Sequence, residues 1–236
     1  MPAHCLADFA VSSYIPTLGV LNGLYSRTPL NATNDGVLLV SQPNTPGLPE
    51  ILSTTAEVQK TREQLEKQGI RSLVFTGSEA TVDVVLESLK SFSWVHLACH
   101  ASQKIKNPLQ SAIHLHDGPL TLSEIMKKKL PNAGLAFMSA CQTSSGDEKL
   151  PEEAVHLAAG MLAAGYRNVV ATMWSISDVH APEVAEIFYK NLLSNKSDSD
   201  GSSARALHAS VQHLRKKLGN SPEALRIWIP YIHAGI

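Results

Sequence analysis

The sequence predicts a single layered α/β domain built around a mostly parallel sheet. Three short runs, at 94–99, 134–140 and 168–173, are apolar over the length of a strand. Continuous apolar runs are typical of strands that are buried on both faces of a parallel sheet. Helical patterns alternate with such runs along the chain. This alternation predicts strand–helix–strand units with right-handed crossovers.

The expected elements follow one another from residue 36 onward. Strands are predicted at 36–41, 72–76, 94–99, 134–140 and 168–173. Helices are predicted at 55–68, 79–90, 151–165, 181–193 and 203–218. The helix at 151–165 has Pro151 in its first turn, acids near its positive end, and a stop at Gly165. The polar segment 195–203 is expected to be a mobile loop.

Composition excludes several classes of protein. The 236 residues carry 20 Lys and Arg against 21 Asp and Glu, a formal net charge of −1, which argues against a nucleic-acid binder. The sequence contains no run of about 18 apolar residues, the length that could span a membrane. Its N-terminus lacks the pattern of a secretory signal. Three cysteines do not form a disulfide framework, so we expect a reduced, cytoplasmic compartment. The ten histidines lack metal-ligand spacing, and we expect no metal and no cofactor.

Two of the buried strands lead into side chains that can react. The run 94–99 continues into His100, and the run 134–140 continues into Cys141. Carboxyl ends of parallel strands share one edge of a sheet, so these two residues should meet there. An imidazole can take the thiol proton, and the thiolate can then attack an acyl carbon.

Other cysteines and histidines have simpler interpretations. Cysteine is among the most buried residue types, so we interpret Cys5 and Cys99 as structural. His96 lies inside an apolar run and is expected to be a core histidine with a hydrogen-bond partner. His114 and His116 alternate with apolar residues before an Asp-Gly pair, which predicts a hairpin.

The chain resembles the CHAT domain, a caspase-like cysteine peptidase family of the clan that also holds caspases and separases. The segments that carry the resemblance are SYIPTLGVL (13–21), WVHLACHA (94–101), PLQSAIHLHDGPLTLSEI (108–125), LAFMSACQT (135–143), LPEEAVHLAAGMLAAGYRNVVATMWSISD (150–178) and WIPYIHAGI (228–236). The resemblance therefore covers nearly all of residues 1–236. The chain most resembles the CHAT domains at the C-terminus of fungal tetratricopeptide-repeat and nucleotide-binding receptor-like proteins. We therefore expect either the terminal domain of a longer protein or a sequence with a shortened start.

The resemblance implies a caspase-like three-layer α/β/α sandwich and a catalytic pair. His100 matches the family's catalytic histidine, and Cys141 matches the nucleophile of its Ser-Ala-Cys motif. The backbone N–H groups of Ala101 and Cys141 would form the oxyanion hole. The clan commonly has glycine at the position of Ala101. Alanine keeps the N–H but lacks glycine's freedom at positive φ.

Two acids are candidates for substrate binding. In separase-like members, an acid shortly after the strand beyond the nucleophile selects a basic residue, and the segment MWSISD (173–178) makes Asp178 the matching candidate. Glu153 follows Cys141 by twelve residues on the next helix and could face the same pocket. Alternatively, Asp178 caps the helix near 181, and Glu153 only favours the N-terminus of its own helix.

These observations leave three functions open. The leading prediction is a cysteine endopeptidase, with a Cys–His dyad that cleaves a protein or peptide substrate after a basic residue. The alternative is a catalytically silent signalling or interaction module that keeps the fold. A third option is an acyl hydrolase that uses the same dyad on esters, which the missing GxSxG-type elbow does not support.

Overall fold

The computed structural model describes residues 5–25, 35–104, 106–130, 132–142, 154–194 and 202–236. Its centre is an eight-stranded sheet whose main path runs in the order β2-β1-β3-β6-β7-β8. These strands are β1 (Val37–Ser41), β2 (Ser72–Thr76), β3 (Trp94–Ser102), β6 (Leu135–Gln142), β7 (Asn168–Thr172) and β8 (Tyr231–Gly235). All pair in parallel except β8, which is antiparallel to β7. The prediction of a mostly parallel sheet is confirmed.

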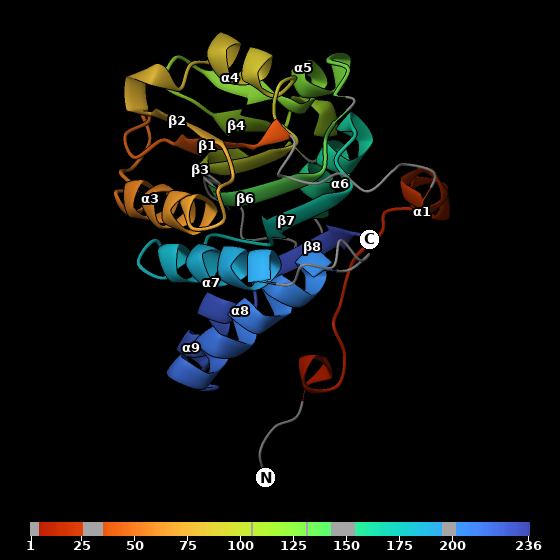
Figure 1. Ribbon diagram of the computed structural model, residues 1–236, viewed down its shortest axis with the longest axis vertical. Coiled ribbons are helices and arrows are strands. Elements are labelled where there is room, and N and C mark those ends of the chain that lie inside the picture. Colours follow the sequence, from red (N-terminus) through yellow and green to blue (C-terminus); the bar gives the residue numbers. More distant parts are fainter. Residues whose placement is uncertain (1–4, 26–34, 105, 131, 143–153, 195–201) are drawn as a thin grey trace.

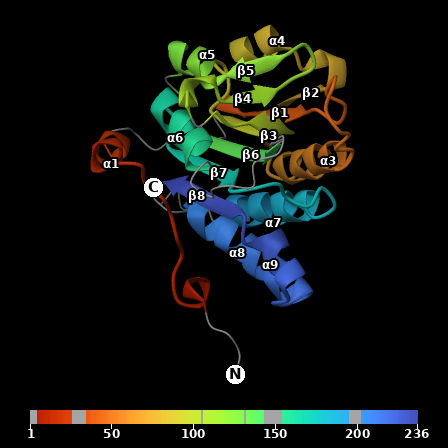
Figure 2. The same ribbon diagram turned by 180° about the vertical axis from the view of Figure 1, so that it is seen from behind.

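Helices cover both faces of this sheet (Figures 1 and 2). One face carries α3 (Ser53–Glu66), α7 (Ala181–Ser194), α8 (Ser202–Leu218) and α9 (Pro222–Trp228). The other face carries α1 (Leu18–Tyr25), α4 (Val82–Ser88), α5 (Leu122–Lys127) and α6 (Ala154–Ala164). Short 3₁₀ turns occur at Leu6–Asp8, Gly77–Glu79 and Pro108–Gln110. This is the three-layer α/β/α arrangement that the sequence predicts.

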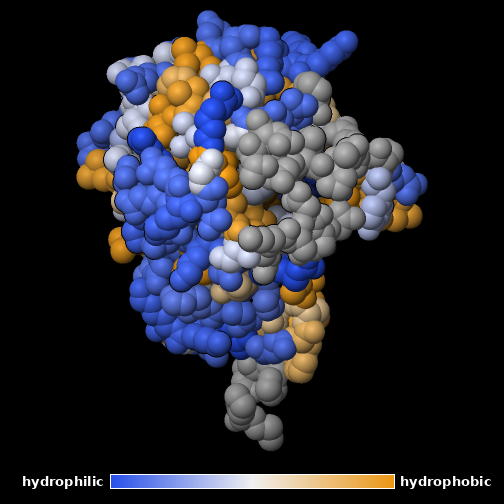
Figure 3. Space-filling view, viewed as in Figure 1, coloured by the Kyte–Doolittle hydropathy of each residue, from blue (hydrophilic) through white to orange (hydrophobic). Residues whose placement is uncertain are grey.

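The strands alternate their side chains between two apolar clusters. On β3, Val95, Leu97 and Cys99 pack into the cluster with α4, α5 and α6. Ala98 packs into the cluster with α3 and α7, which also holds Phe137 of β6. The outer surface over α3 and α7 is mainly hydrophilic, as Figure 3 shows. The apolar runs of the sequence are thus buried on both faces, as parallel strands require.

Strands β3 and β6 extend beyond their predicted ends. The prediction ended them at Cys99 and Ala140, but they continue to Ser102 and Gln142. The extension of β3 is paired on both sides, with β6 and with a hairpin of β4 (Ala112–His114) and β5 (Pro119–Thr121). The hairpin prediction is confirmed, and the two reactive residues lie inside strands rather than after them.

The C-terminal end of the fold was not predicted from the sequence pattern. Strand β8 pairs along its full length with β7, and Ala234 also bridges to Tyr14 of the N-terminal segment. That segment runs beside β8 (Figure 1). Helix α8 begins at Ser202, and the rest of the predicted polar loop lies outside the described residues. Among the described residues, no helix is long and apolar enough to cross a membrane.

Candidate active site

His100 and Cys141 are direct neighbours on adjacent parallel strands. The register of β3 and β6 pairs His100 with Cys141, and neighbouring strands lie about 4.8 Å apart. Ala98 and Phe137 precede them by two and four residues and face the cluster of α3 and α7. The twofold alternation of a strand therefore places His100 and Cys141 on that same face. This placement of Cys141 rests on the backbone of β6.

The His100 ring is fixed by a backbone carbonyl. The side chain is buried, and its Nε2 lies 2.7 Å from the carbonyl oxygen of Pro49. A carbonyl only accepts, so Nε2 carries the proton. Nδ1 is buried and has no hydrogen-bond partner within the described ranges. In the neutral ring, Nδ1 is therefore the nitrogen that can act as a base.

Pro49 is a site residue that the sequence analysis missed. It belongs to the Pro/Gly-rich connection between β1 and α3, where the Ile51 amide also donates to the Pro43 carbonyl at 3.0 Å. Because the functional atom is a backbone oxygen, no side-chain motif could identify it.

A second histidine flanks His100 on the side opposite Cys141. His114 of β4 is the register partner of His100, and its Nε2 lies 2.9 Å from Oγ of Ser102. Burial lowers the pKa of His114, and the nearby His100 and Lys104 lower it further. The row across three strands is thus His114, His100 and Cys141.

Ala101 occupies an extended position in the middle of three strands. It pairs with Gln142 of β6 and with Ile113 of β4, and its side chain is buried. A strand backbone suits alanine as well as glycine, because positive φ is not required there.

Asp178 lies in the segment after β7 and contacts the start of α3. Its Oδ2 accepts a hydrogen bond from the Ser53 amide at 3.2 Å. The alternative cap on α7 is not found, since the amides of His180 and Ala181 donate to the carbonyl of Ser177. The N-cap of α3 is Leu52, which has no side-chain acceptor, so Asp178 supplies one. Glu153 lies outside the described residues.

The CHAT domain family model matches residues 4–236. This chain belongs to the CHAT domain family. Solved structures with the same fold have low sequence identity to it, and no curated protein sequence matches it. At such identities the likeness shows the fold alone, which is that of caspase-like proteases.

Three solved structures illustrate the likeness. The Arg-specific cysteine proteinase gingipain R (RgpB) has a TM-score of 0.62 at 10% identity, covering 92% of this chain and 51% of the other. Separase in the Saccharomyces cerevisiae separase–securin complex has a TM-score of 0.60 at 12% identity, covering 95% and 13%. The complex of Porphyromonas gingivalis RgpB pro- and mature domains has a TM-score of 0.58 at 10% identity, covering 90% and 50%. The CHAT domain thus spans about half of the gingipain chains and a much smaller part of separase.

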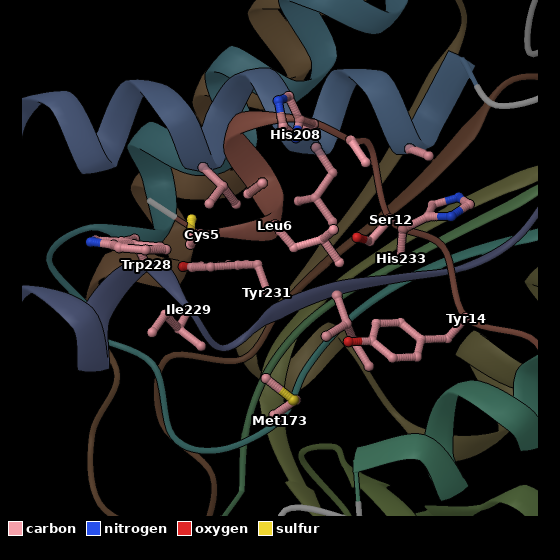
Figure 4. Close-up of a pocket in the computed structure, with 16 residues that line it drawn as sticks. Cys5, Leu6, Ser12, Tyr14, Met173, His208, Trp228, Ile229, Tyr231 and His233 are labelled. Carbon is pink, nitrogen blue, oxygen red and sulfur yellow. The ribbon is translucent and has the colours of Figure 1, made fainter. Parts of the chain in front are cut away.

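The CHAT domain also has a cavity of about 310 Å³ away from these residues. It lies between the N-terminal segment, α8, α9 and β8, and Figure 4 shows Leu6, Trp228 and Tyr231 around it. None of the predicted site residues lines it. Within the part of the chain that the structure describes, no group of three or more His, Cys, Asp or Glu could hold a metal ion.

Proposed function

We propose that this CHAT domain is a cysteine endopeptidase in which Cys141 is the nucleophile and His100 is its base. The observation that carries the proposal is the register pair of these two residues on one face of the sheet. The hydrogen bond from His100 to Pro49 adds support, because it leaves Nδ1 as the free basic nitrogen. The fold of caspase-like proteases agrees with this chemistry.

The reaction would proceed in two halves. The Cys141 thiol gives its proton to Nδ1 of His100, and the sulfur bonds to the carbonyl carbon of the scissile peptide. Nδ1 then protonates the leaving amine, and the carbon–nitrogen bond breaks to leave a thioester. Water next gives a proton to Nδ1 and attacks the thioester, and the thiol returns as the acid is released. The Pro49 carbonyl would stabilise the imidazolium in both halves by accepting a hydrogen bond from Nε2–H.

The developing oxyanion would be held by the backbone N–H groups of Cys141 and Ala101. These residues lie on adjacent strands, where Ala101 pairs with the residue after Cys141. The oxyanion would therefore form at the same edge of the sheet as the dyad.

A basic residue before the scissile bond would be bound by Asp178, with Glu153 as a second candidate. Asp178 contacts Ser53, which is four residues after Pro49 in the chain. Four residues span at most about 14 Å, so the Ser53 contact of Asp178 lies within that reach of the residue that holds the His100 ring. A carboxylate in that position would favour Lys or Arg in the substrate.

The test is intact-protein mass spectrometry after brief exposure to a peptidyl acyloxymethyl ketone that ends in Lys or Arg. We expect one label per wild-type chain, none for Cys141→Ala or His100→Ala, and one for the control Cys5→Ser. A ketone ending in Leu should label more slowly. Native wild type that stays unlabelled, yet alkylates normally once unfolded, would favour the silent interaction module instead.

A further inference from the structure

A buried carboxylate on α3 joins that helix to two strands of the sheet. Glu57 is 1% exposed. Its Oε1 lies 3.0 Å from Nε2 of His96 on β3, and its Oε2 accepts a hydrogen bond from Oγ of Ser139 on β6 at 3.1 Å. Both oxygens of the carboxylate are therefore used, and each contacts a different strand.

The hydrogen bonds of Glu57 continue through His96 to helix α7. The hydroxyl of Tyr189 on α7 lies 3.2 Å from Nδ1 of His96. Burial raises the pKa of Tyr189, and the charge of Glu57 raises it further, so this hydroxyl keeps its proton. The carboxylate of Glu57 accepts from Nε2–H of His96, and the ring's second hydrogen bond joins Nδ1 to the Tyr189 hydroxyl. The His96 ring is also stacked on Phe137, with centroids 4.7 Å apart and planes 6° apart.

This network lies on the same two strands as the reactive pair, two to four residues earlier in the chain. Ser139 precedes Cys141 by two residues and His96 precedes His100 by four, so all four residues belong to one face of the sheet. Glu57 therefore contacts the same two strands that carry the nucleophile and the base. The helix that carries Glu57 is preceded by Pro49, whose carbonyl holds the His100 ring.

We propose that Glu57 is a positioning residue for the dyad, an inference that rests on the proposed function. Apolar side chains could attach α3 to the sheet without the cost of burying a carboxylate. Charge-assisted hydrogen bonds to His96 and Ser139 add a fixed direction. They hold β3, β6 and α3 in one relative position. That position places His100 beside Cys141 and the Pro49 carbonyl against the His100 ring.

The experiment compares the wild-type chain of residues 1–236 with Glu57→Gln and Ser139→Ala. The matched control is Ser203→Ala, which removes a buried hydroxyl from another histidine network, at His233. One readout is the labelling kinetics of the Lys- or Arg-ended acyloxymethyl ketone, resolved into kinact and KI. The other is the His100 tautomer, observed by long-range ¹H–¹⁵N spectra, which needs no activity.

We expect kinact to fall roughly 10- to 100-fold in Glu57→Gln, with KI changed less than about twofold, because misplacement affects the reacting geometry. Ser139→Ala should also lower kinact with little change in KI, but by a smaller factor. If Glu57→Gln does not fold, Ser139→Ala alone tests whether this network positions His100 and Cys141. Both variants should lose the single Nε2–H form of His100, while Ser203→Ala keeps it. Wild-type kinact and an unchanged tautomer in both variants would overturn the inference. If wild type is not labelled at all, the proposed function fails, and the tautomer alone decides whether Glu57 positions His100.

Discussion

The carbonyl oxygen of Pro49 lies 2.7 Å from Nε2 of His100, although 51 residues separate the two in the chain. The contact assigns the His100 proton to Nε2, and Nδ1 has no hydrogen-bond partner among the residues that the structure describes. The dyad that we propose would need no buried acid as a third member. The Pro49 carbonyl would take the orienting role in that dyad.

Asp178 has two possible roles, and substitutions separate them. If it binds the basic residue of a substrate, Asp178→Asn should lower the preference for Lys or Arg over Leu by roughly tenfold or more. A tenfold loss corresponds to about 1.4 kcal/mol of binding free energy. Asp178→Glu should keep the preference. The measurement is cleavage of a peptide library by each variant.

The cap on α3 gives the contrasting result for Asp178. Loss of the contact with the Ser53 amide should cost about 1 kcal/mol of unfolding free energy. A lower stability with an unchanged preference for basic residues would mean that Asp178 is a cap only.

The buried His233 predicts an acid-sensitive fold. Its Nδ1 and Nε2 contact the hydroxyls of Ser13 and Ser203, and burial lowers its pKa from 6.5 to about 4. The unfolded chain therefore binds a proton between these values that the folded chain does not. The contribution of His233 to the unfolding free energy is therefore fully present above pH 6.5. It is lost as the pH falls toward 4, by about 3 kcal/mol in total.

Urea unfolding at a series of pH values between 7 and 4 measures this loss. The unfolding free energy should decrease less steeply in His233→Gln, which keeps hydrogen-bonding atoms but does not titrate. Equal slopes for wild type and variant would show that His233 is not the source of the acid sensitivity.

Two glycines at positive φ provide a matched pair for the C-terminal strand. Gly235 of β8 has φ 123°, and a Cβ added there would lie 2.1 Å from the carbonyl oxygen of Arg167. Gly219 has φ 82° with nothing within 4 Å of an added Cβ. Gly219→Ala should cost about 1 kcal/mol from backbone strain alone. Gly235→Ala should cost about 3 kcal/mol or more, because the chain must also move away from a backbone atom.

Thermal and urea unfolding of both alanine variants give these costs. Similar losses at the two positions would contradict the close approach of β8 to the end of α6 and the start of β7.

The interior of the fold could be predicted from the sequence because its strands are continuously apolar. The runs at 36–41 and 94–99 became β1 and the first part of β3, and the helical pattern at 181–193 became α7. The edge strand β8 could not be predicted in this way. Its five residues include His233 and Gly235, and its strand state depends on pairing with β7.

The candidate site was predictable only where a side chain carries the signal. His100 and Cys141 follow apolar runs, so the rule for parallel strand ends brought them together. Glu57 lies in a helix with many charged residues, a pattern typical of a surface position, yet its carboxylate is buried against two strands of the sheet. Asp178 contacts an amide 125 residues away, a pairing that only the tertiary structure shows.

The most direct test of the dyad is the rate at which each cysteine of the native chain reacts with iodoacetamide. Brief alkylation followed by peptide mapping compares Cys141 with Cys5 and Cys99 in wild type and in His100→Ala. We predict that Cys141 reacts about tenfold or more faster than Cys5 and Cys99 in wild type, and that this advantage is lost in His100→Ala. Equal reactivity of Cys141 in the two proteins would contradict a nucleophile activated by His100.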